Sequence, residues 1–399
     1  MKTKKSLLYF ALILCGYSTS SFAQEAAAAA TTPLVEEEEE KPFTLSGSVD
    51  AYYHTSFGSQ TKSPSTSFAN LNGFALGMVN LIGAYDGEKV GFKADVVFGP
   101  RGFDAVFANT YTGSVGGTAP GQRIVNQLYA YYKLGKKVTL NLGQFNTFYG
   151  YEVISPTGNF HYSTSYMFSW GPFNHTGLRA DFDLGGGFVG KLAIMNPTDL
   201  VEFNPVNTYT LGGQIGYAND GGSIYFNVLY GDQDGTLDKN DPGLYPGTTS
   251  QGSTLALDIT TGWSLSEKFY LGLNTTYRTK AKGETFNGTT IVDTIEETNG
   301  FLGVAIYPKL TLSESFALGL RGEYFKVNKG YLPSTVIGLD AKGNGSVTEL
   351  TLSGNYKTGG LTIIPELRLD STSEDTFTDK DFKASKSLIT ANLAAVYKF

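Results

Sequence analysis

The residues best suited to covalent chemistry in this 399-residue chain lie between positions 161 and 175. Ser163 stands two positions after His161 and shares its segment with His175. A serine nucleophile needs a histidine base within hydrogen-bond reach. The chain has only three histidines, and none stands in a recognised catalytic pattern. We therefore expect no enzymatic activity and assign no catalytic residue.

A second group of residues has the chemistry of a cation site. Asp232, Asp234 and Asp238 follow one another closely, and calcium favours clustered carboxylate and carbonyl oxygens. The segment departs from the EF-hand pattern, because the glycine does not fall at the sixth position and the closing glutamate is missing. A solvated acidic loop is the preferred interpretation. These aspartates remain a weak calcium candidate, and we predict no cofactor.

The composition excludes several classes of protein. Gly (49), Phe (27) and Tyr (25) are abundant while only 17% of residues are charged, which is unlike a typical soluble enzyme. The formal net charge of −7 offers no basic surface for nucleic acid. Beyond the N-terminus no apolar stretch approaches the roughly 18 residues of a membrane-spanning helix. A polytopic helical membrane protein and a nucleic-acid partner are therefore excluded.

The first residues have the organisation of an export signal. Three lysines precede an apolar run, and Ser21-Phe22-Ala23 supplies the small residues that signal peptidase accepts. We predict a signal peptide over 1–23. Cys15 resembles a lipoprotein cysteine only faintly, because Leu14 stands where a small residue is expected, so we expect it to be removed with the signal.

Residues 24–42 differ in composition from the rest of the chain. They contain an alanine run and five consecutive glutamates from Glu36 to Glu40, a composition that buries little and repels itself. We predict a flexible acidic periplasmic extension here, with a docking peptide for an envelope partner as the alternative. The remaining residues, 43–399, form the predicted folded domain.

The pattern from Phe43 onward has a period of two. In the last segment Ile389, Leu393 and Tyr397 fall on one face, and Thr390 and Asn392 on the other. The same alternation predicts sixteen strands, at 43–55, 73–85, 90–99, 122–133, 138–146, 175–183, 188–195, 208–217, 223–231, 252–263, 268–278, 299–308, 315–325, 347–356, 361–370 and 386–399. Connections after even-numbered strands are short, and most of the others are long.

Sixteen antiparallel strands with short turns at one end and long loops at the other are typical of an outer-membrane β-barrel. A sheet can cross a bilayer only when it closes on itself, because lipid cannot satisfy free strand edges. The alternative, a soluble propeller or sandwich, would bury its apolar face and does not require export. We therefore predict an all-β transmembrane barrel in the bacterial outer membrane. Its expected partners are membrane lipid and lipopolysaccharide, the barrel-assembly machinery through the C-terminal strand, and further copies of the chain in a possible homotrimer.

Aromatic residues near strand ends support this assignment, since amphipathic rings favour the membrane interface. Those expected there are Tyr53, Tyr85, Tyr132, Trp263, Tyr277, Tyr307, Tyr324 and Tyr397. Tyrosine also has a high strand propensity in any sheet, so the pattern is supportive only.

A barrel of this size encloses water, and alternation predicts which side chains line it. They are Lys93, Asp95, Arg123, Tyr129, Tyr131, Lys133, Arg179, Asp181, Asp183, Lys191, Asp258, Arg278, Arg321, Glu323, Glu366 and Arg368. An arginine facing lipid near the midplane would cost roughly 2–4 kcal/mol. Two interpretations stay open and are compatible. The charges either select solutes by the field across the pore, or pair with one another to stabilise the wall.

The third long connection, about 147–174, carries the most specific signatures. It and its flanks contain Gly143-Gln144, Tyr149-Gly150-Tyr151-Glu152, Ser165-Tyr166 and His175-Thr176-Gly177-x-Arg179. This order of signatures closely resembles the OmpL-like β-barrel porin family of bacterial outer membranes, and the resemblance runs from about Phe43 to Phe399. It implies a pore-forming outer-membrane protein. It assigns neither a solute nor a catalytic residue.

Long ordered loops are usually functional, and so many aromatic residues are poorly suited to solvent. We expect the loop to fold into the barrel and narrow it, with Tyr149, Tyr151, Glu152, His161, Tyr162, Tyr166 and Arg179 at the constriction. The tyrosine rings would either stack on polar solutes or wedge the loop against the wall. The leading function is passive diffusion of ions and small hydrophilic solutes. The alternative is a plugged structural or adhesive barrel.

Overall fold

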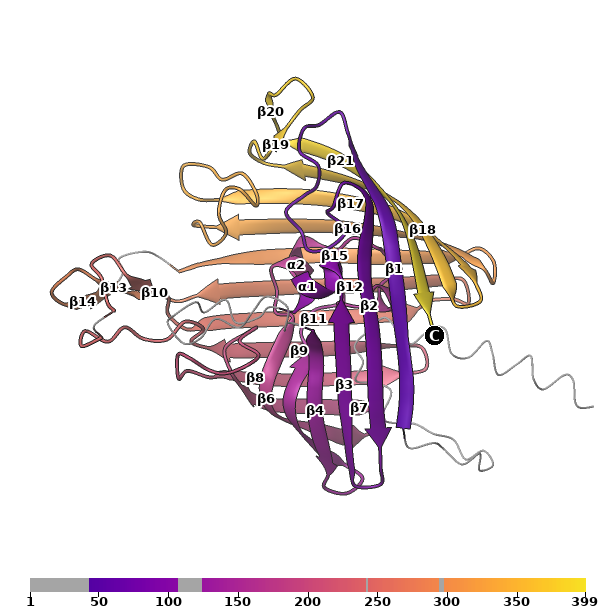
Figure 1. Ribbon diagram of the computed structural model, residues 1–399, viewed down its shortest axis with the longest axis horizontal. Helices are drawn as coiled ribbons and strands as arrows, with labels where there is room; N and C mark the ends of the chain where they lie inside the picture. Colours follow the sequence, from indigo (N-terminus) through magenta and orange to yellow (C-terminus); the bar gives the residue numbers. More distant parts are fainter. Residues whose placement is uncertain (1–42, 107–123, 242, 294–297) are drawn as a thin grey trace, which may run out of the picture.

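The computed structural model describes residues 43–106, 124–241, 243–293 and 298–399, and sixteen of its strands form one closed antiparallel barrel (Figure 1). Each barrel strand pairs with the next along the chain, and β1 pairs with the last strand to close the ring. The barrel strands are β1 (Phe43–Phe57), β2 (Gly73–Asp86), β3 (Val90–Phe98), β4 (Val125–Lys133), β5 (Val138–Asn146), β6 (Asn174–Gly185), β7 (Phe188–Met195), β8 (Thr210–Asn219), β9 (Gly222–Gly231), β11 (Thr254–Ser264), β12 (Phe269–Lys280), β15 (Asn299–Thr311), β16 (Phe316–Asn328), β17 (Gly345–Thr358), β18 (Leu361–Thr372) and β21 (Ser387–Lys398). The sixteen predicted strands are confirmed, with ends that differ by three residues or fewer.

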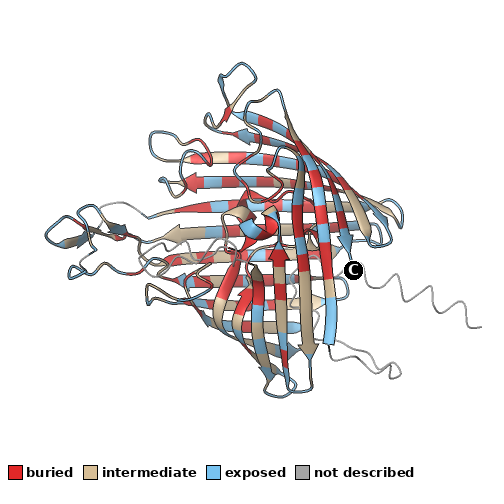
Figure 2. Cartoon of the chain, viewed as in Figure 1, coloured by how far each residue is buried: buried red, intermediate tan, exposed pale blue. Residues whose placement is uncertain are grey.

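The wall alternates between an apolar outer face and a more polar inner face. On β21, Leu393 is 52% exposed while its neighbour Asn392 is 5% exposed. Figure 2 shows this alternation as successive buried and exposed bands along the strands. Because successive side chains of a strand point to opposite faces, the outward leucines and aromatic residues form the surface that lipid would cover.

The two ends of the barrel differ in the length of their connections. The turn between β6 and β7 consists of Gly185, Gly186 and Gly187, all with φ between 63° and 86°. Glycine adopts this left-handed region without steric cost, so the three glycines permit a tight reversal.

Among the described residues no helix is both long enough and apolar enough to cross a membrane.

Several short elements outside the barrel wall were not predicted from the sequence. Two short helices, α1 (Pro100–Ala105) and α2 (Tyr166–Ser169), lie within the outline of the barrel in Figure 1, and η3 (Pro156–Gly158) belongs to the same connection as α2. A small sheet of β10 (Thr249–Ser250), β13 (Glu284–Phe286) and β14 (Ile291–Asp293) projects from one end of the barrel. The strands β19 (Phe377–Thr378) and β20 (Ala384–Ser385) form a two-stranded hairpin.

One aromatic residue expected at the membrane interface was placed on the wrong face. Tyr307 is only 5% exposed and lies on the inner face of β15, in phase with Phe301 and Ala305. The outward residues of this strand are Leu302, Val304 and Ile306. Position near a strand end suggested the interface, but alternation decides which face a residue occupies.

Candidate functional site

The residues predicted to line the pore fall into a sealed group and a more accessible group. Arg123 lies outside the described residues, and the others stand on barrel strands as expected from alternation. On β16 and β18, the side chains of Arg321 and Arg368 are essentially inaccessible. Across the β3 to β7 part of the wall, Lys133 and Asp181 keep 32% and 26% of their side-chain surface. In this second part, Lys133 and Asp181 face solvent, while Asp95 on β3 and Lys191 on β7 are at most 7% exposed.

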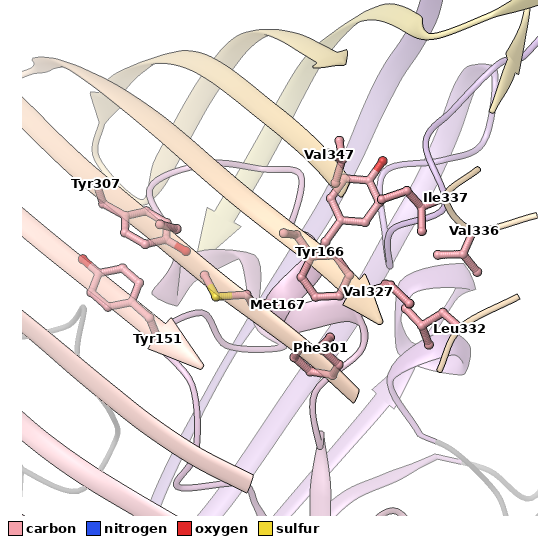
Figure 3. Packing of buried hydrophobic residues seen from close by; sticks show 12 residues of the cluster. Tyr151, Tyr166, Met167, Phe301, Tyr307, Val327, Leu332, Val336, Ile337 and Val347 are labelled. Atoms are coloured by element: carbon pink, nitrogen blue, oxygen red, sulfur yellow. The ribbon is translucent and has the colours of Figure 1, made fainter. Parts of the chain in front are cut away.

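The burial of the first group is caused by the connection between β5 and β6, residues 147–173, which we call the third loop. It runs inside the barrel, and Tyr149, Tyr151, His161, Tyr162 and Tyr166 are each at most 9% exposed. Figure 3 shows Tyr151 and Tyr166 among buried side chains of the wall and of the connection between β16 and β17. Glu152, the acidic residue predicted at the constriction, is also buried.

Arg321 is the main charged contact between the wall and the third loop. Its guanidinium donates to the carboxylate of Glu152 at 2.7 Å and to the backbone oxygen of Ser163 at 2.7 Å. It also donates to Glu349 on the neighbouring strand β17, at 3.0 Å. An arginine buried in this way needs partners for its donors, and both the loop and the wall supply them.

Arg368 makes a similar contact two strands further on, on β18. Its guanidinium donates twice to the carboxylate of Asp370, both times at 2.8 Å, and once to the backbone oxygen of Thr164 at 2.8 Å. Two parallel bonds between a guanidinium and a carboxylate fix orientation as well as charge. The two arginines therefore bind consecutive carbonyl groups of the third loop, those of Ser163 and Thr164.

Two wall glutamates bind the same part of the loop through its N–H groups. Glu366 accepts hydrogen bonds from the backbone of Tyr162 at 2.8 Å and Ser163 at 3.1 Å. Glu323 accepts from the backbone of Tyr166 and Met167, both at 2.7 Å. Buried backbone groups that lack secondary-structure partners need others. The wall carboxylates therefore accept hydrogen bonds from backbone N–H groups that have no partner within the loop or the first turn of α2.

Glycines on the inner wall make room for side chains of the third loop. A Cβ atom on Gly303 would approach the side chain of Met167 closer than 3 Å, and one on Gly319 would do the same to Phe160. The hydroxyl-bearing end of the Tyr151 ring occupies the corresponding space at Gly272. The loop thus packs directly against the strand backbone at these positions.

Stacked and hydrogen-bonded tyrosines complete this contact. The rings of Tyr151 and Tyr307 stack with centroids 4.2 Å apart (Figure 3), and the hydroxyls of Tyr151 and Tyr270 are 3.0 Å apart. Further along the wall, Asp258 accepts from the backbone N–H of Gly150 at 3.1 Å. The aromatic residues of the loop are therefore engaged by the wall and by the loop itself.

His161 is held neutral by its surroundings. Its Nδ1 lies 2.8 Å from the hydroxyl oxygen of Ser353. Burial, together with the positive charge of Arg321, lowers the pKa of His161 to about 4, although Glu366 and Glu349 act in the opposite direction. At neutral pH the ring therefore carries no charge.

Ser163 and the two histidines considered for a catalytic pair have different hydrogen-bond partners. The Ser163 hydroxyl accepts from Arg321 at 3.3 Å, while His175 Nε2 lies 2.9 Å from the hydroxyl of Thr147. With His161 bound to Ser353, neither histidine hydrogen-bonds to Ser163 in the described part of the chain. The arrangement gives the serine no base.

The aspartates considered for calcium bind their own loop. Asp232 accepts from the backbone of Asp234 and Gly235, and Asp238 accepts from that of Asn240. Within the described ranges, no group of three or more His, Cys, Asp or Glu side chains is placed to hold a metal ion.

Sequence reasoning missed several members of this site. Glu349 and Asp370 lie on the inner faces of predicted strands, so applying alternation to every charged residue would have found them. Arg101 lies on α1, outside any strand, yet it is buried and donates to the backbone oxygens of Ile154 and Tyr162. No pattern in the sequence signals that contact.

Two cavities border the third loop. The smaller is about 20 Å³ and lies among Tyr151, Phe160, Tyr270 and Lys309. The larger is about 700 Å³ and is bordered by Trp170 of the loop, Arg278 and Lys280 of β12, and long connections of the same end. The loop therefore stands between a wide vestibule and a narrow space.

The chain is similar to known proteins in sequence and in fold. A family model described as "Putative beta-barrel porin-2, OmpL-like" matches residues 42–399. The solved structure of the outer-membrane channel DcaP of Acinetobacter baumannii is similar, with 14% identity, a TM-score of 0.54, and coverage of 90% of this chain and 97% of that one. None of the curated proteins compared with the chain matches it.

Two further solved structures have the same fold. An anion-selective porin from Comamonas acidovorans is 11% identical with a TM-score of 0.53, covering 90% of this chain and 99% of that one. OmpF of Salmonella typhi, in complex with daunomycin, is 11% identical with a TM-score of 0.56, covering 90% and 97%. At these identities the likeness concerns the fold, which is that of outer-membrane barrels.

Proposed function

The chain belongs to the OmpL-like beta-barrel porin-2 family, and from that premise we propose passive diffusion of ions and small hydrophilic solutes through its barrel. Family and fold agree with the expected porin class and the bacterial outer membrane. The proposed passage needs no covalent chemistry and no cofactor. The observation that supports it most is the unequal burial of the inner wall.

The third loop is the proposed constriction. It covers the β15 to β18 part of the wall, where Arg321 and Arg368 are buried against it. The β3 to β7 part keeps accessible charged groups, including Lys133 and Asp181. The loop also packs on Val97 of β3 and Met195 of β7. Solutes would therefore pass beside the accessible charges of β4 and β6 and the other polar residues predicted to line the pore.

The two interpretations of the loop tyrosines now differ in support. Tyr149, Tyr151 and Tyr166 are almost completely buried, and Tyr151 stacks on a wall tyrosine. A ring in that position has little surface left for a solute. We infer that these rings wedge the loop against the wall, and that the accessible Lys133 and Asp181 set ion preference, with Arg179 and Lys191 paired to Asp181.

The plugged barrel remains the second candidate, because the buried bonds between Arg321, Arg368 and the loop would also hold a closed state. Conductance of the refolded protein in a planar lipid bilayer separates the two. Stable current steps, with a reversal potential in a salt gradient that gives ion preference, are expected. A folded barrel that inserts and carries no current would overturn diffusion and favour the plug.

We also propose the expected partners of the barrel: lipid, lipopolysaccharide, the barrel-assembly machinery and further copies of the chain. Outward Leu393 and Tyr397 of β21 would meet lipid and lipopolysaccharide, and this C-terminal strand would engage the barrel-assembly machinery. A homotrimer is tested by chemical cross-linking in native outer membranes, where a band of three subunits is expected.

A further inference from the structure

The larger cavity has an unusual lining for a solvent-filled vestibule. Arg278 and Lys280 stand at the end of β12 that leads into a long loop, and Trp170 forms part of the floor. Tyr331 and Val336 border it from the connection between β16 and β17. Its volume of about 700 Å³ falls within the 300–1,000 Å³ typical of small-molecule sites.

Within the described residues, neither cation of this cavity forms an ion pair, although Asp199 lies near Arg278 and Asp234 near Lys280. In the described parts of the chain, neither Arg278 nor Lys280 has a carboxylate oxygen within 4.0 Å. The Nε atom of Arg278 is buried and lacks a hydrogen-bond partner among the same residues. That atom is inaccessible to a solute, but Arg278 as a whole lines the cavity, so its guanidinium is placed to meet an incoming acceptor. Lys280 Nζ lies 5.5 Å from the centre of the Tyr331 ring, which holds it at the cavity.

The acids closest to the cavity are already engaged. Asp199, which borders it, accepts hydrogen bonds from the backbone of Phe173 at 2.9 Å and Asn174 at 2.8 Å. Asp234, near Lys280, accepts from the backbone of Gln251 at 3.0 Å. Burial also raises the pKa of Asp199 to about 6, which further limits its charge below neutral pH. The lining of the cavity contains two cations, Arg278 and Lys280, and one acid, Asp199, so its net charge is about +1.

The lining of the cavity also includes an apolar surface. The Trp170 indole N–H donates to the backbone oxygen of Ser65 at 3.1 Å, which fixes the ring. Leu332 and Val336 are buried beside it and border the same space. A fixed aromatic ring next to aliphatic side chains suits a flat apolar group.

We propose that this vestibule is a binding site for small aromatic carboxylates. The carboxylate accepts hydrogen bonds from Arg278 and Lys280, and the ring packs on Trp170 and Val336. Charge-assisted bonds give orientation, and the apolar contact distinguishes such a solute from chloride or phosphate. The inference deepens the proposed function, because it names the class of solute that the porin would collect. Binding itself does not require conduction.

The chain offers a direct reporter of this binding. It has two tryptophans, Trp170 and Trp263, and Trp263 lies at the far end of the neighbouring strand β11. In the refolded Trp263→Phe protein all tryptophan emission comes from Trp170. Titration with benzoate is expected to change that emission in a saturable way, and calorimetry on the unaltered protein should give the same affinity.

Substitutions and an uncharged analogue test the recognition. Arg278→Gln and Lys280→Gln should each weaken benzoate binding about tenfold, since each removes a charged hydrogen bond. Lys386→Gln removes the same charge from the loop end of the barrel, away from the cavity, and should leave binding unchanged. Benzyl alcohol should bind at least tenfold more weakly than benzoate.

Several results would overturn the proposal. These are the absence of saturable binding by the folded protein, equal affinity for benzyl alcohol, or equal losses in Lys386→Gln and the two cavity variants. Conductance in potassium chloride is recorded on the same samples. A silent barrel that binds benzoate would refute diffusion and keep this site, and a conducting barrel without binding would refute the site alone.

Discussion

Arg321 on β16 and Glu152 in the third loop form a buried ion pair, with Nη1 and Oε1 2.7 Å apart, although 169 positions separate them. The same guanidinium binds Glu349, so one residue connects two wall strands to the loop. Removing one member of a buried ion pair leaves the other charges without compensation. Arg321 is therefore one of the main contacts that hold the loop in position.

Replacing Arg321 by methionine should lower the free energy of unfolding by about 3–5 kcal/mol, because Glu152 would be left buried without its cation and Glu349 would keep only its longer contact with Arg368. Urea unfolding from lipid vesicles measures the change. Lys133→Met is the matched control, since its pair with Asp86 is accessible and should contribute about 0–1 kcal/mol. Equal losses in the two variants would contradict a special role for Arg321.

The sequence was sufficient for the barrel and insufficient for the loop contacts. Strict alternation in segments such as Ile389 to Tyr397 predicts both a strand and its faces, because the period of two is a local property. The pairing of Arg321 with Glu152 depends on register and on how a 27-residue connection folds inside a closed wall. Neither follows from local patterns, and the inward position of Arg101 on a short helix was missed for the same reason.

For the residues predicted to line the pore, the sequence predicts the face of the wall but not the accessibility of the side chain. Alternation placed Arg321, Glu366 and Arg368 on the inner face, and they lie there. It could not indicate that the third loop would cover them while Lys133 stayed accessible. The distinction between a wall that faces water and a wall that binds a loop comes from three-dimensional packing.

Acidification should loosen the third loop through His161. Its pKa is about 4 in the folded protein and about 6.5 when exposed, so the fold favours the neutral ring. The stability this provides is complete above pH 6.5 and is lost as pH falls towards 4, by up to about 3 kcal/mol. The difference in unfolding free energy between the wild type and His161→Asn should change over that range. A difference that is constant from pH 7 to pH 4 would refute this.

Removing part of the third loop should widen the passage. Deletion of residues 155–168 takes away the segment bound by Glu366, Arg321 and Glu323, and we expect a larger single-channel conductance in planar bilayers. Deletion of residues 238–248, in the region that leads to the projecting sheet, should leave the conductance unchanged. If the first deletion also leaves it unchanged, the third loop does not limit the flow.

Glycine on the inner wall should be essential where the third loop touches the backbone. Valine at Gly303 would collide with the side chain of Met167, whose backbone N–H is fixed by Glu323. Overpacking of a filled site typically costs about 1–3 kcal/mol. Because the loop must move aside, Gly303→Val should both lower stability and alter conductance. Gly322→Val, on the outer face of β16, meets only ordinary contacts with Leu350 and Ile306 and should change neither quantity. If both variants lose the same stability and keep the wild-type conductance, the loss does not come from the collision with Met167, and the contact between the loop and the wall is not required to set the channel.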